Sequence, residues 1–449
     1  MSVALSFASR ILRGETEAYL RFLTRGGSCA PIDQLVEAGA DPRGEQVYDD
    51  AFRYFEETLD QFEKLMRENR HREAAALLQE KKGSSALLRN LNYIISRMDP
   101  EEEQTFLSKF PADCSTLLLL QLLFWYETKE KEEGRIFRFS RHNLGKMHCE
   151  TPEEQERRKS NLTEEQKKRV GAMLHEKLAE KLKNRLGKVY IAPSMKNYAL
   201  PMAENTAQGG LGVLAKGSKL PIAEGKKVRA FVYWEKIDDI DLSVFALKED
   251  GTQKEFSWRT MSGQQSKALT FSGDETSGYY GGSEYFDVNI PKVKELYPDY
   301  RYMIFCANVY SGVNFDECFC KAGFMLRDQE DSGQVYEPKT VRSAYLVNCA
   351  NTFAYLFGID LHTNELVWLN EARNSRLRIA GDSSLSVLMD NFRITEIMNV
   401  QDFFAMMAEE IVEDPMEAEI VVTDHEVACA DGAEIVREYD FEKMKALME

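Results

Sequence analysis

The sequence has no excess of basic residues and no long apolar run. Lys and Arg number 57 against 74 Asp and Glu, which leaves a formal charge of −17 over 449 residues. Because nucleic-acid binding needs a basic face that displaces counterions from phosphates, this balance argues against DNA or RNA as a partner. The strongest apolar run, Leu117–Trp125, contains Gln121 and is far shorter than the roughly 20 residues that span a bilayer. The sequence therefore predicts neither nucleic-acid binding nor a membrane-spanning segment.

Cysteine is scarce and its pattern excludes several classes of protein. The eight cysteines are scattered, and only Cys318 and Cys320 lie close together, so neither a disulfide framework nor a zinc-finger spacing is present. Residues Met1–Ala4 lack the basic start and the small-residue cleavage site of a secretory leader. We therefore expect reduced, mostly buried thiols and a cytoplasmic location.

Common catalytic motifs are missing as well. A zinc peptidase helix carries two histidines four residues apart with a glutamate between them, but neither His175-Glu176 nor His425-Glu426 is followed by the second histidine. Residues Gly212–Gly217 have the glycine spacing of a phosphate loop, yet Ser218-Lys219 follows in reverse order. No Gly-x-Ser-x-Gly elbow occurs, and the six histidines are spread over distant regions. We predict that the chain is not an enzyme and has no catalytic residues.

Four regions differ in their hydrophobic pattern. Residues 1–66 and 67–185 show helical spacing, and the first region ends in an apolar stripe over Ala51–Met66. Over residues 186–345 the period shifts toward two, with β-branched and aromatic residues and turn sequences between the runs. Residues 346–449 combine a hairpin with helices. The sequence thus predicts an α+β chain: a helical N-terminal half, an antiparallel β-sandwich and a mixed C-terminal region.

Individual elements can also be placed. Thr163 and Gln166 form a capping-box pattern that opens a helix toward Leu182. A second helix is expected over Phe403–Val412. The expected strands are Val228–Trp234, Leu242–Leu247, Arg301–Tyr310 and Ala322–Arg327, followed by a hairpin of Phe353–Leu361 and Glu365–Leu369.

Acidic residues gather near the ends of expected strands. Asp238–Asp241 stands at the start of one strand, and the glycine-rich segment Ser272–Gly278 is followed by Glu284 and Asp287. Oxygen ligands on loops that glycine lets fold tightly suit a hard cation such as Ca²⁺. The alternative is that these acids simply face water, as charged residues at strand ends commonly do. The residues by themselves leave both interpretations open.

The sequence around these acids resembles the TerD family of tellurium-resistance and stress-response proteins, especially its longer members. The resemblance rests on two motifs, Asp239–Phe245 and Ser272–Gly278, and extends more weakly over residues 110–370. It implies a two-sheet, calcium-binding fold, a role in stress response and no known catalysis. Carried over position by position, it makes these four residues the candidate Ca²⁺ ligands: Asp239, Asp241, Asp274 and Glu284.

The chain departs from that family in the glycine-rich loop. Family members usually place further acids where this chain has Tyr279–Ser283. Because fewer carboxylates attract a divalent ion less strongly, we expect weaker Ca²⁺ binding than in the family.

Residues 1–66 resemble another family, at the extreme C-terminal helices of oligoendopeptidase F, a thimet-type zinc peptidase. In that family the zinc helix and the substrate-binding tyrosines lie upstream of this segment, and no substitute zinc motif appears later in this sequence. No catalytic residue is therefore carried over. The matching stretches are Tyr19–Leu23, Gly26–Ser28, Pro31–Ile32, Ala38–Pro42 and Ala51–Met66.

Together these features predict a non-catalytic, cytoplasmic stress-response protein of TerD type that binds Ca²⁺ and works with protein partners. One alternative is a metallopeptidase fragment or fusion, related to oligoendopeptidase F, that lacks its zinc motif. The other is a helical interaction or scaffold module, in which residues 67–185 present a partner-binding stripe. The acidic balance favours basic or cationic partners in either case.

Overall fold

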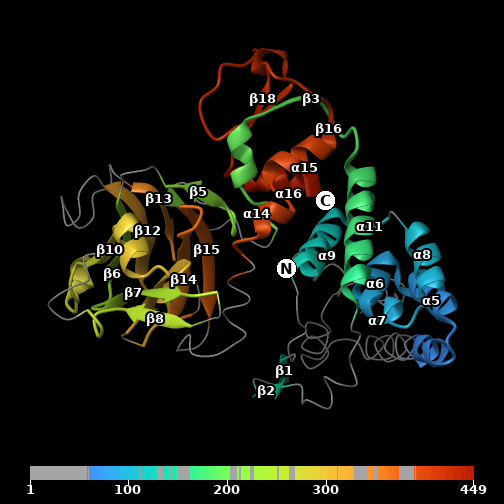
Figure 1. Cartoon of the computed structure of the whole chain (residues 1–449), viewed down its shortest axis with the longest axis horizontal. Coiled ribbons are helices and arrows are strands. Elements are labelled where there is room, and N and C mark those ends of the chain that lie inside the picture. Colours follow the sequence, from blue (N-terminus) through green and yellow to red (C-terminus); the bar gives the residue numbers. More distant parts are fainter. Residues whose placement is uncertain are drawn as a thin grey trace, which may run out of the picture. The chain divides into compact units, whose positions relative to one another are not determined.

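A computed structural model gives the fold of most of the chain (Figure 1). The chain divides into two compact units, residues 1–181 and 182–449, and each is described by itself. The peptidase-like segment, residues 1–66, lies outside the described residues except for positions 58 and 60–66. The structure describes residues 58, 60–111, 113–128, 136–141, 144–149, 162–202, 210–211, 214–222, 227–249, 252–261, 268–310, 312–327, 341–347, 351–373, 389 and 391–448.

The first unit is mainly helical, as its sequence pattern predicts, but it also contains one hairpin. Strands β1 and β2 pair antiparallel over six positions, which the helical prediction for residues 67–185 did not include. Phe137–Ser140 does alternate between apolar and polar residues, but the run is short and flanked by charged residues, so it gives only a weak strand signal. The elements are α5 (His71–Lys82), α6 (Ser84–Arg89), α7 (Leu91–Ile95), α8 (Pro100–Ser108), α9 (Thr116–Thr128), β1 (Ile136–Arg141), β2 (Leu144–Cys149) and α11 (Glu164–Leu182).

Polar contacts fix where two of these helices begin and how they pack. The predicted capping box is confirmed: the Gln166 amide donates to the Thr163 hydroxyl, and the Thr163 amide donates to the Gln166 side chain. The Asp99 carboxylate caps α8 by accepting from two backbone amides. Glu103, only 1% exposed, accepts from Arg169 at 2.7 Å and thereby joins α8 to α11. Such a paired buried carboxylate fixes the orientation of the two helices.

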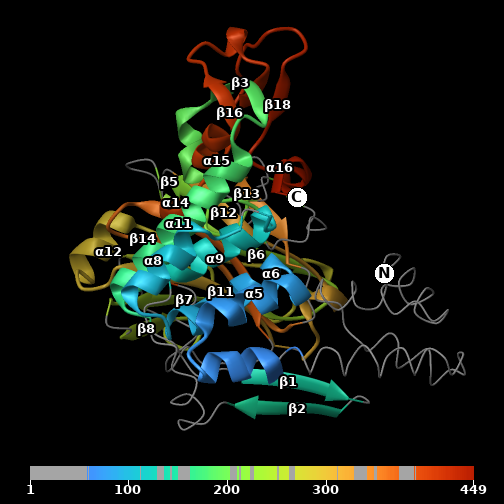
Figure 2. The ribbon, with the colours of Figure 1, turned by 90° about the vertical axis from the view of Figure 1, so that its right-hand side faces the viewer.

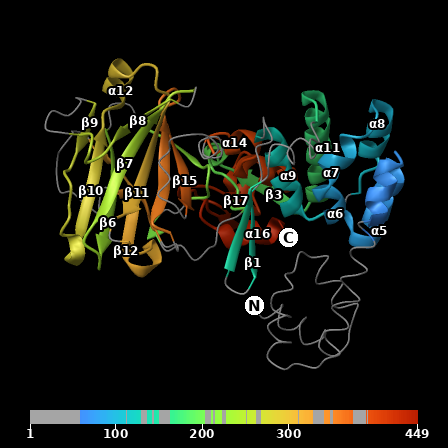
Figure 3. The same cartoon turned by 90° about the horizontal axis from the view of Figure 1, so that it is seen from below.

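The second unit contains two six-stranded antiparallel sheets, which Figure 3 shows side by side. The combination of helices with antiparallel sheets makes the chain α+β. One sheet has the order β4 (Gly210–Leu211), β13 (Val341–Leu346), β12 (Phe319–Arg327), β6 (Lys227–Glu235), β10 (Gly282–Val288) and β9 (Leu269–Phe271). The other has the order β5 (Lys219–Pro221), β15 (Glu365–Arg373), β14 (Phe353–Asp360), β11 (Tyr302–Val309), β7 (Ile240–Leu247) and β8 (Gln253–Phe256).

Apolar side chains from both sheets form the core between them. The rings of Phe324 in β12 and Phe357 in β14 pack edge to face with centroids 5.9 Å apart. Trp234 and Trp368 are fully buried, and the Trp368 ring stacks on Phe357. Burial of such large aromatic surfaces is the main stabilising contribution to a two-sheet core.

The predicted hairpin after residue 346 is confirmed, and it belongs to the second sheet. Strands β14 and β15 pair through Asp360 and Glu365 at the turn, and β14 also pairs with β11. The sequence pattern assigned these residues to a separate mixed region, because strand pairing across long sequence separations leaves no local trace.

The second unit also contains a four-stranded parallel sheet, in the order β16, β3, β17 and β18. Figure 2 labels β3, β16 and β18 of this sheet. The helix expected over Phe403–Val412 ends at Met407, and the next four residues form β16, paired with β3. Tertiary pairing has here overridden local helix propensity. These elements are β3 (Leu186–Ile191), α14 (Ile394–Ile397), α15 (Val400–Met407), β16 (Ala408–Ile411), β17 (Ile420–Val422), β18 (Glu434–Val436) and α16 (Phe441–Met448).

Two further expectations concern membranes and cysteines. Among the described residues, none of the helices combines the length and apolar character needed to cross a bilayer. The five cysteines whose side chains the structure describes are free thiols, and three of them, Cys114, Cys306 and Cys320, are buried.

Candidate metal centre

The acidic residues before β7 and those before β10 are brought together by backbone contacts between two loops. The chain turns after β6 at Lys236, whose φ of 69° is left-handed, and enters β7 at Ile240. The Lys236 amide donates to the Tyr279 carbonyl at 2.8 Å, and the Gly278 amide donates to the Asp238 carbonyl at 2.8 Å. These bonds hold the glycine-rich loop against the turn that carries Asp239.

The glycines of this loop are required by a close approach to one side chain. An added Cβ at Gly278 or at Gly282 would lie 2.4 Å from the Trp234 indole, which is fully buried. The Trp234 Nε1 also donates to the Asp238 carbonyl at 3.4 Å. Glycine here therefore allows the loop to pack on the end of β6, in addition to letting it turn.

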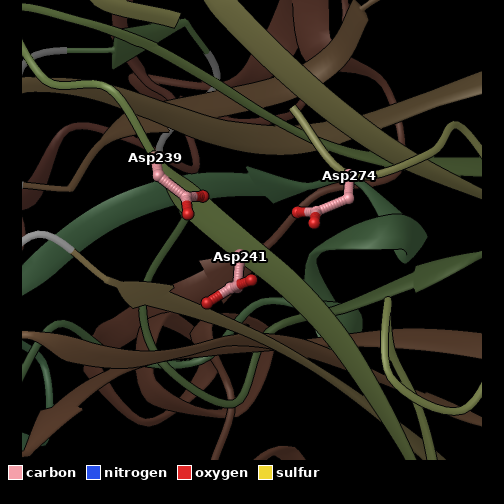
Figure 4. A group of neighbouring side chains, drawn as sticks. All are labelled: Asp239, Asp241 and Asp274. Carbon is pink, nitrogen blue, oxygen red and sulfur yellow. The ribbon is translucent and has the colours of Figure 1, made fainter. Parts of the chain in front are cut away.

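Three of the four predicted ligands converge at this point (Figure 4). Asp239, Asp241 and Asp274 each offer a carboxylate oxygen, and these oxygens all lie within 4.8 Å of one another. Asp241 is buried, Asp239 is partly buried and Asp274 is exposed. In the part of the chain that the structure describes, this is the one group of three or more His, Cys, Asp or Glu side chains so arranged.

The electrostatics of the three carboxylates are unfavourable without a cation. Burial, and then the charges of Asp241 and Asp274, raise the pKa of Asp239 to about 6. Burial also raises the pKa of Asp241, against the effect of a hydrogen bond from the Asn308 side chain. No described Lys or Arg forms an ion pair with any of the three acids. Arg259 forms its ion pair with Glu255 instead, at 3.1 Å. Like charges this close favour protonation or a bound cation.

One oxygen of the group lacks any partner within the protein. The Oδ1 atom of Asp239 is buried and has no hydrogen-bond partner among the described residues. A buried acceptor without a partner is costly, because it has lost its hydration and gained nothing in exchange. A cation at this position would supply the missing interaction.

Glu284, the fourth predicted ligand, has a different placement. It is fully buried, and its two carboxylate oxygens accept from the Leu242 amide at 2.7 Å and from the Glu275 amide at 3.2 Å. Burial is the largest influence on its pKa, which rises to about 8 despite these two hydrogen bonds. Its assignment as a ligand stays a prediction; what the geometry shows is a side chain that bridges the two acid-bearing segments.

Asp287, which follows Glu284 in the same motif, points elsewhere. It lies opposite Arg229 in the register of β10 and β6 and forms a bidentate pair with that guanidinium at 2.6 and 2.7 Å. The Arg229 guanidinium also lies 3.8 Å from the centre of the Tyr285 ring. The Asp287 carboxylate is therefore occupied by a buried, bidentate ion pair, which is a structural contact and not an ion site.

Asn308 is a residue of the site that no sequence pattern selects. It lies opposite Asp241 in the register of β11 and β7, and its side chain hydrogen bonds to that carboxylate. The two positions are distant in sequence, so only strand register connects them.

Comparisons with known proteins identify no relative. No family model, curated protein or solved structure matches the chain. The resemblances to TerD proteins and to oligoendopeptidase F stay predictions.

Proposed function

We propose that the chain is a non-catalytic, cytoplasmic stress-response protein of TerD type that binds Ca²⁺ at Asp239, Asp241 and Asp274. The observation that carries the metal proposal is the convergence of these carboxylates around the unpartnered Oδ1 of Asp239. An all-oxygen ligand set, from the start of β7 and from the glycine-rich loop, matches the chemistry of a hard cation.

A bound ion would act on the stability of the two-sheet body. Without a cation the three carboxylates repel one another, and burial adds to the cost of charging Asp239. An ion that binds the folded state and not the unfolded one stabilises the fold by mass action. Occupancy by Ca²⁺ would thus be linked to the stability of the sheets from which Asp241 and Glu284 come.

The biological role is inferred from the resemblance to TerD proteins and from composition. Two antiparallel sheets that hold Asp-rich loops at one end agree with the fold which that resemblance implies. The free thiols of the described cysteines agree with a reducing compartment. The formal charge of −17 favours basic protein surfaces as partners.

Thermal unfolding with and without calcium tests the metal proposal. The melting temperature of the full chain should rise in millimolar Ca²⁺ and fall on addition of a chelator, and the double variant Asp239→Asn with Asp241→Asn should lose this response. Asp238→Asn is the matched control, since Asp238 is exposed in the same turn and outside the group of three. Absence of any melting shift at millimolar Ca²⁺ would refute calcium binding.

A further inference from the structure

A second group of polar side chains lies at one edge of the four-stranded parallel sheet. Strands β3, β17 and β18 are adjacent and parallel, so their carboxyl ends meet at a common edge. Ser194 follows β3, Asp424 and His425 follow β17, and Glu438 follows β18. The carboxyl edge of parallel strands is where open sheets with helices bind ligands.

Asp424 is the centre of this group, which we name the Asp424 cluster: Ser194, Tyr198, Asp424, His425 and Glu438. Its Oδ1 accepts from the Ser194 hydroxyl at 2.6 Å and lies 2.8 Å from His425 Nδ1. Its Oδ2 accepts from the Tyr198 hydroxyl at 2.9 Å. Burial opposes ionisation of Asp424, yet hydrogen bonds from these three side chains outweigh it and lower its pKa.

The hydroxyls of Ser194 and Tyr198 and the Nδ1 of His425 are all engaged with Asp424. Because an ionised carboxylate can only accept, the hydrogen bond between His425 Nδ1 and Asp424 Oδ1 uses a proton on Nδ1. His425 faces solvent, with 59% of its side chain exposed. The serine and tyrosine hydroxyls direct their protons to Asp424 and retain only acceptor capacity.

Glu438 adds an acceptor that the protein does not use. Its Oε2 is buried and lacks a hydrogen-bond partner among the residues that the structure describes. The Thr423 amide donates to the Val436 carbonyl at 3.0 Å, which brings the end of β18 beside the segment that carries Asp424. Burial, and then the charge of Asp424, raise the pKa of Glu438. The neighbouring cation Arg437 is engaged elsewhere, since it donates to the His425 carbonyl and pairs with Glu426 at 3.0 Å.

We propose that the Asp424 cluster binds the ammonium group of an alkylamine, with Glu438 Oε2 as its principal acceptor. The groups left unused by the cluster are acceptors and one is a carboxyl, so a donor-rich cation complements them and an anion does not. A metal ion fits less well, because no three ligand atoms of His425, Asp424 and Glu438 lie together within ligand spacing in the described structure. This proposal is independent of the calcium site.

The test is an NMR titration of the full chain with putrescine, followed through the imidazole resonance of His425, one of six histidines. We expect a saturable shift at millimolar putrescine. Tetramethylammonium, which has the same kind of charge and no N–H donors, should produce no saturable shift. Nα-acetyl-lysine amide forms a second arm: tighter binding of this compound points to a lysine side chain as the natural ligand, and tighter binding of putrescine points to a free amine.

Substitutions separate specific binding from general attraction to an acidic protein. Glu438→Gln should weaken putrescine binding about tenfold or more, as expected for the loss of a hydrogen bond between charged groups. Glu442→Gln, at an exposed position of α16, is the matched control and should bind as the wild type does. Three results with the unsubstituted protein would overturn the proposal. They are no shift with putrescine, an equal shift with tetramethylammonium, and a saturable shift with Mg²⁺ alone.

Discussion

The carboxylate of Glu284 in β10 accepts a hydrogen bond at 2.7 Å from the backbone amide of Leu242 in β7, a strand of the other sheet. Its second oxygen accepts from Glu275 in the glycine-rich loop. One buried side chain therefore connects the strand that carries Asp241 to the loop that carries Asp274. The geometry of the candidate metal centre depends on this connection.

Removing the Glu284 carboxylate should destabilise the second unit strongly. Glu284→Ala leaves the Leu242 and Glu275 amides without their acceptor, at an expected cost of about 2–5 kcal/mol. Glu284→Gln should cost less, because the amide oxygen can still accept one of the two bonds. Denaturant unfolding of the full chain measures both, with the exposed Glu295→Ala in α12 (Ile290–Leu296) as control. Equal stability of Glu284→Ala and the control would contradict the bridging role.

Stability of the metal-free protein should fall as pH rises from about 4 to 8. The folded-state pKa values of Asp239 and Glu284, about 6 and about 8, are raised above the ordinary values of 3.8 and 4.5. A raised pKa gives stability that is fully present below the ordinary value and is lost as pH rises through the folded-state value. The test measures the melting temperature in chelator across this pH range, for the wild type and for Glu284→Gln, and compares the two pH dependences. Unchanged pH dependence in that variant would refute the contribution of Glu284.

Calcium affinity should follow the opposite trend with pH. Metal ligands must be deprotonated, and Asp239 is mostly protonated well below its pKa of about 6. Titration calorimetry with Ca²⁺ should therefore give weaker binding at acidic than at neutral pH, with protons released on binding. An affinity that is independent of pH would show that Asp239 is not a ligand.

Asp274→Asn should have opposite effects in the two states of the site. In chelator the substitution should raise stability by a few tenths to about 1 kcal/mol, because it removes one of three mutually repelling charges at a partly exposed site. In Ca²⁺ it should abolish the stabilising shift. Paired melting curves of the variant and of Asp238→Asn reveal this change of sign. A loss of stability in both conditions would indicate a purely structural aspartate.

The buried pair of Arg229 and Asp287 should behave as a structural unit. Asp287→Asn should cost about 3–5 kcal/mol, because it leaves a buried guanidinium without its counter-charge. The double replacement Arg229→Met with Asp287→Leu should recover most of this loss. A double-mutant cycle by denaturant unfolding measures the coupling, and additive effects of the two single changes would contradict it.

Sequence patterns predicted the elements whose signals are local. The strands around Val228–Trp234 and Leu242–Leu247, the Thr163 capping box and the hairpin at Asp360 all follow from short-range periodicity or turn chemistry. The parallel sheet could not be predicted in this way, because its strands are short and pair across long sequence separations. The end of α15 at Met407 depends on the pairing of the next residues with β3, which no local pattern contains.

The same distinction applies to the candidate sites. Asp239, Asp241 and Asp274 lie in two compact motifs, so the sequence could nominate them together. The pairing of Asp287 with Arg229 and the contact from Asn308 depend on strand register. The bridging position of Glu284 depends on how one sheet packs on the other. The Asp424 cluster combines residues from three strand ends, and neither His425-Glu426 nor Ser194 shows a recognisable motif. Long-range geometry alone brings them together.

The most direct test of the account is a crystal structure of the protein soaked in Ca²⁺, with anomalous scattering used to locate the ion. We expect one ion bound between Asp239, Asp241 and Asp274, with oxygen distances of about 2.3–2.6 Å and with Asp239 Oδ1 among its ligands. Density for an ion elsewhere, or three carboxylates that remain without an ion at millimolar Ca²⁺, would contradict the proposed metal centre.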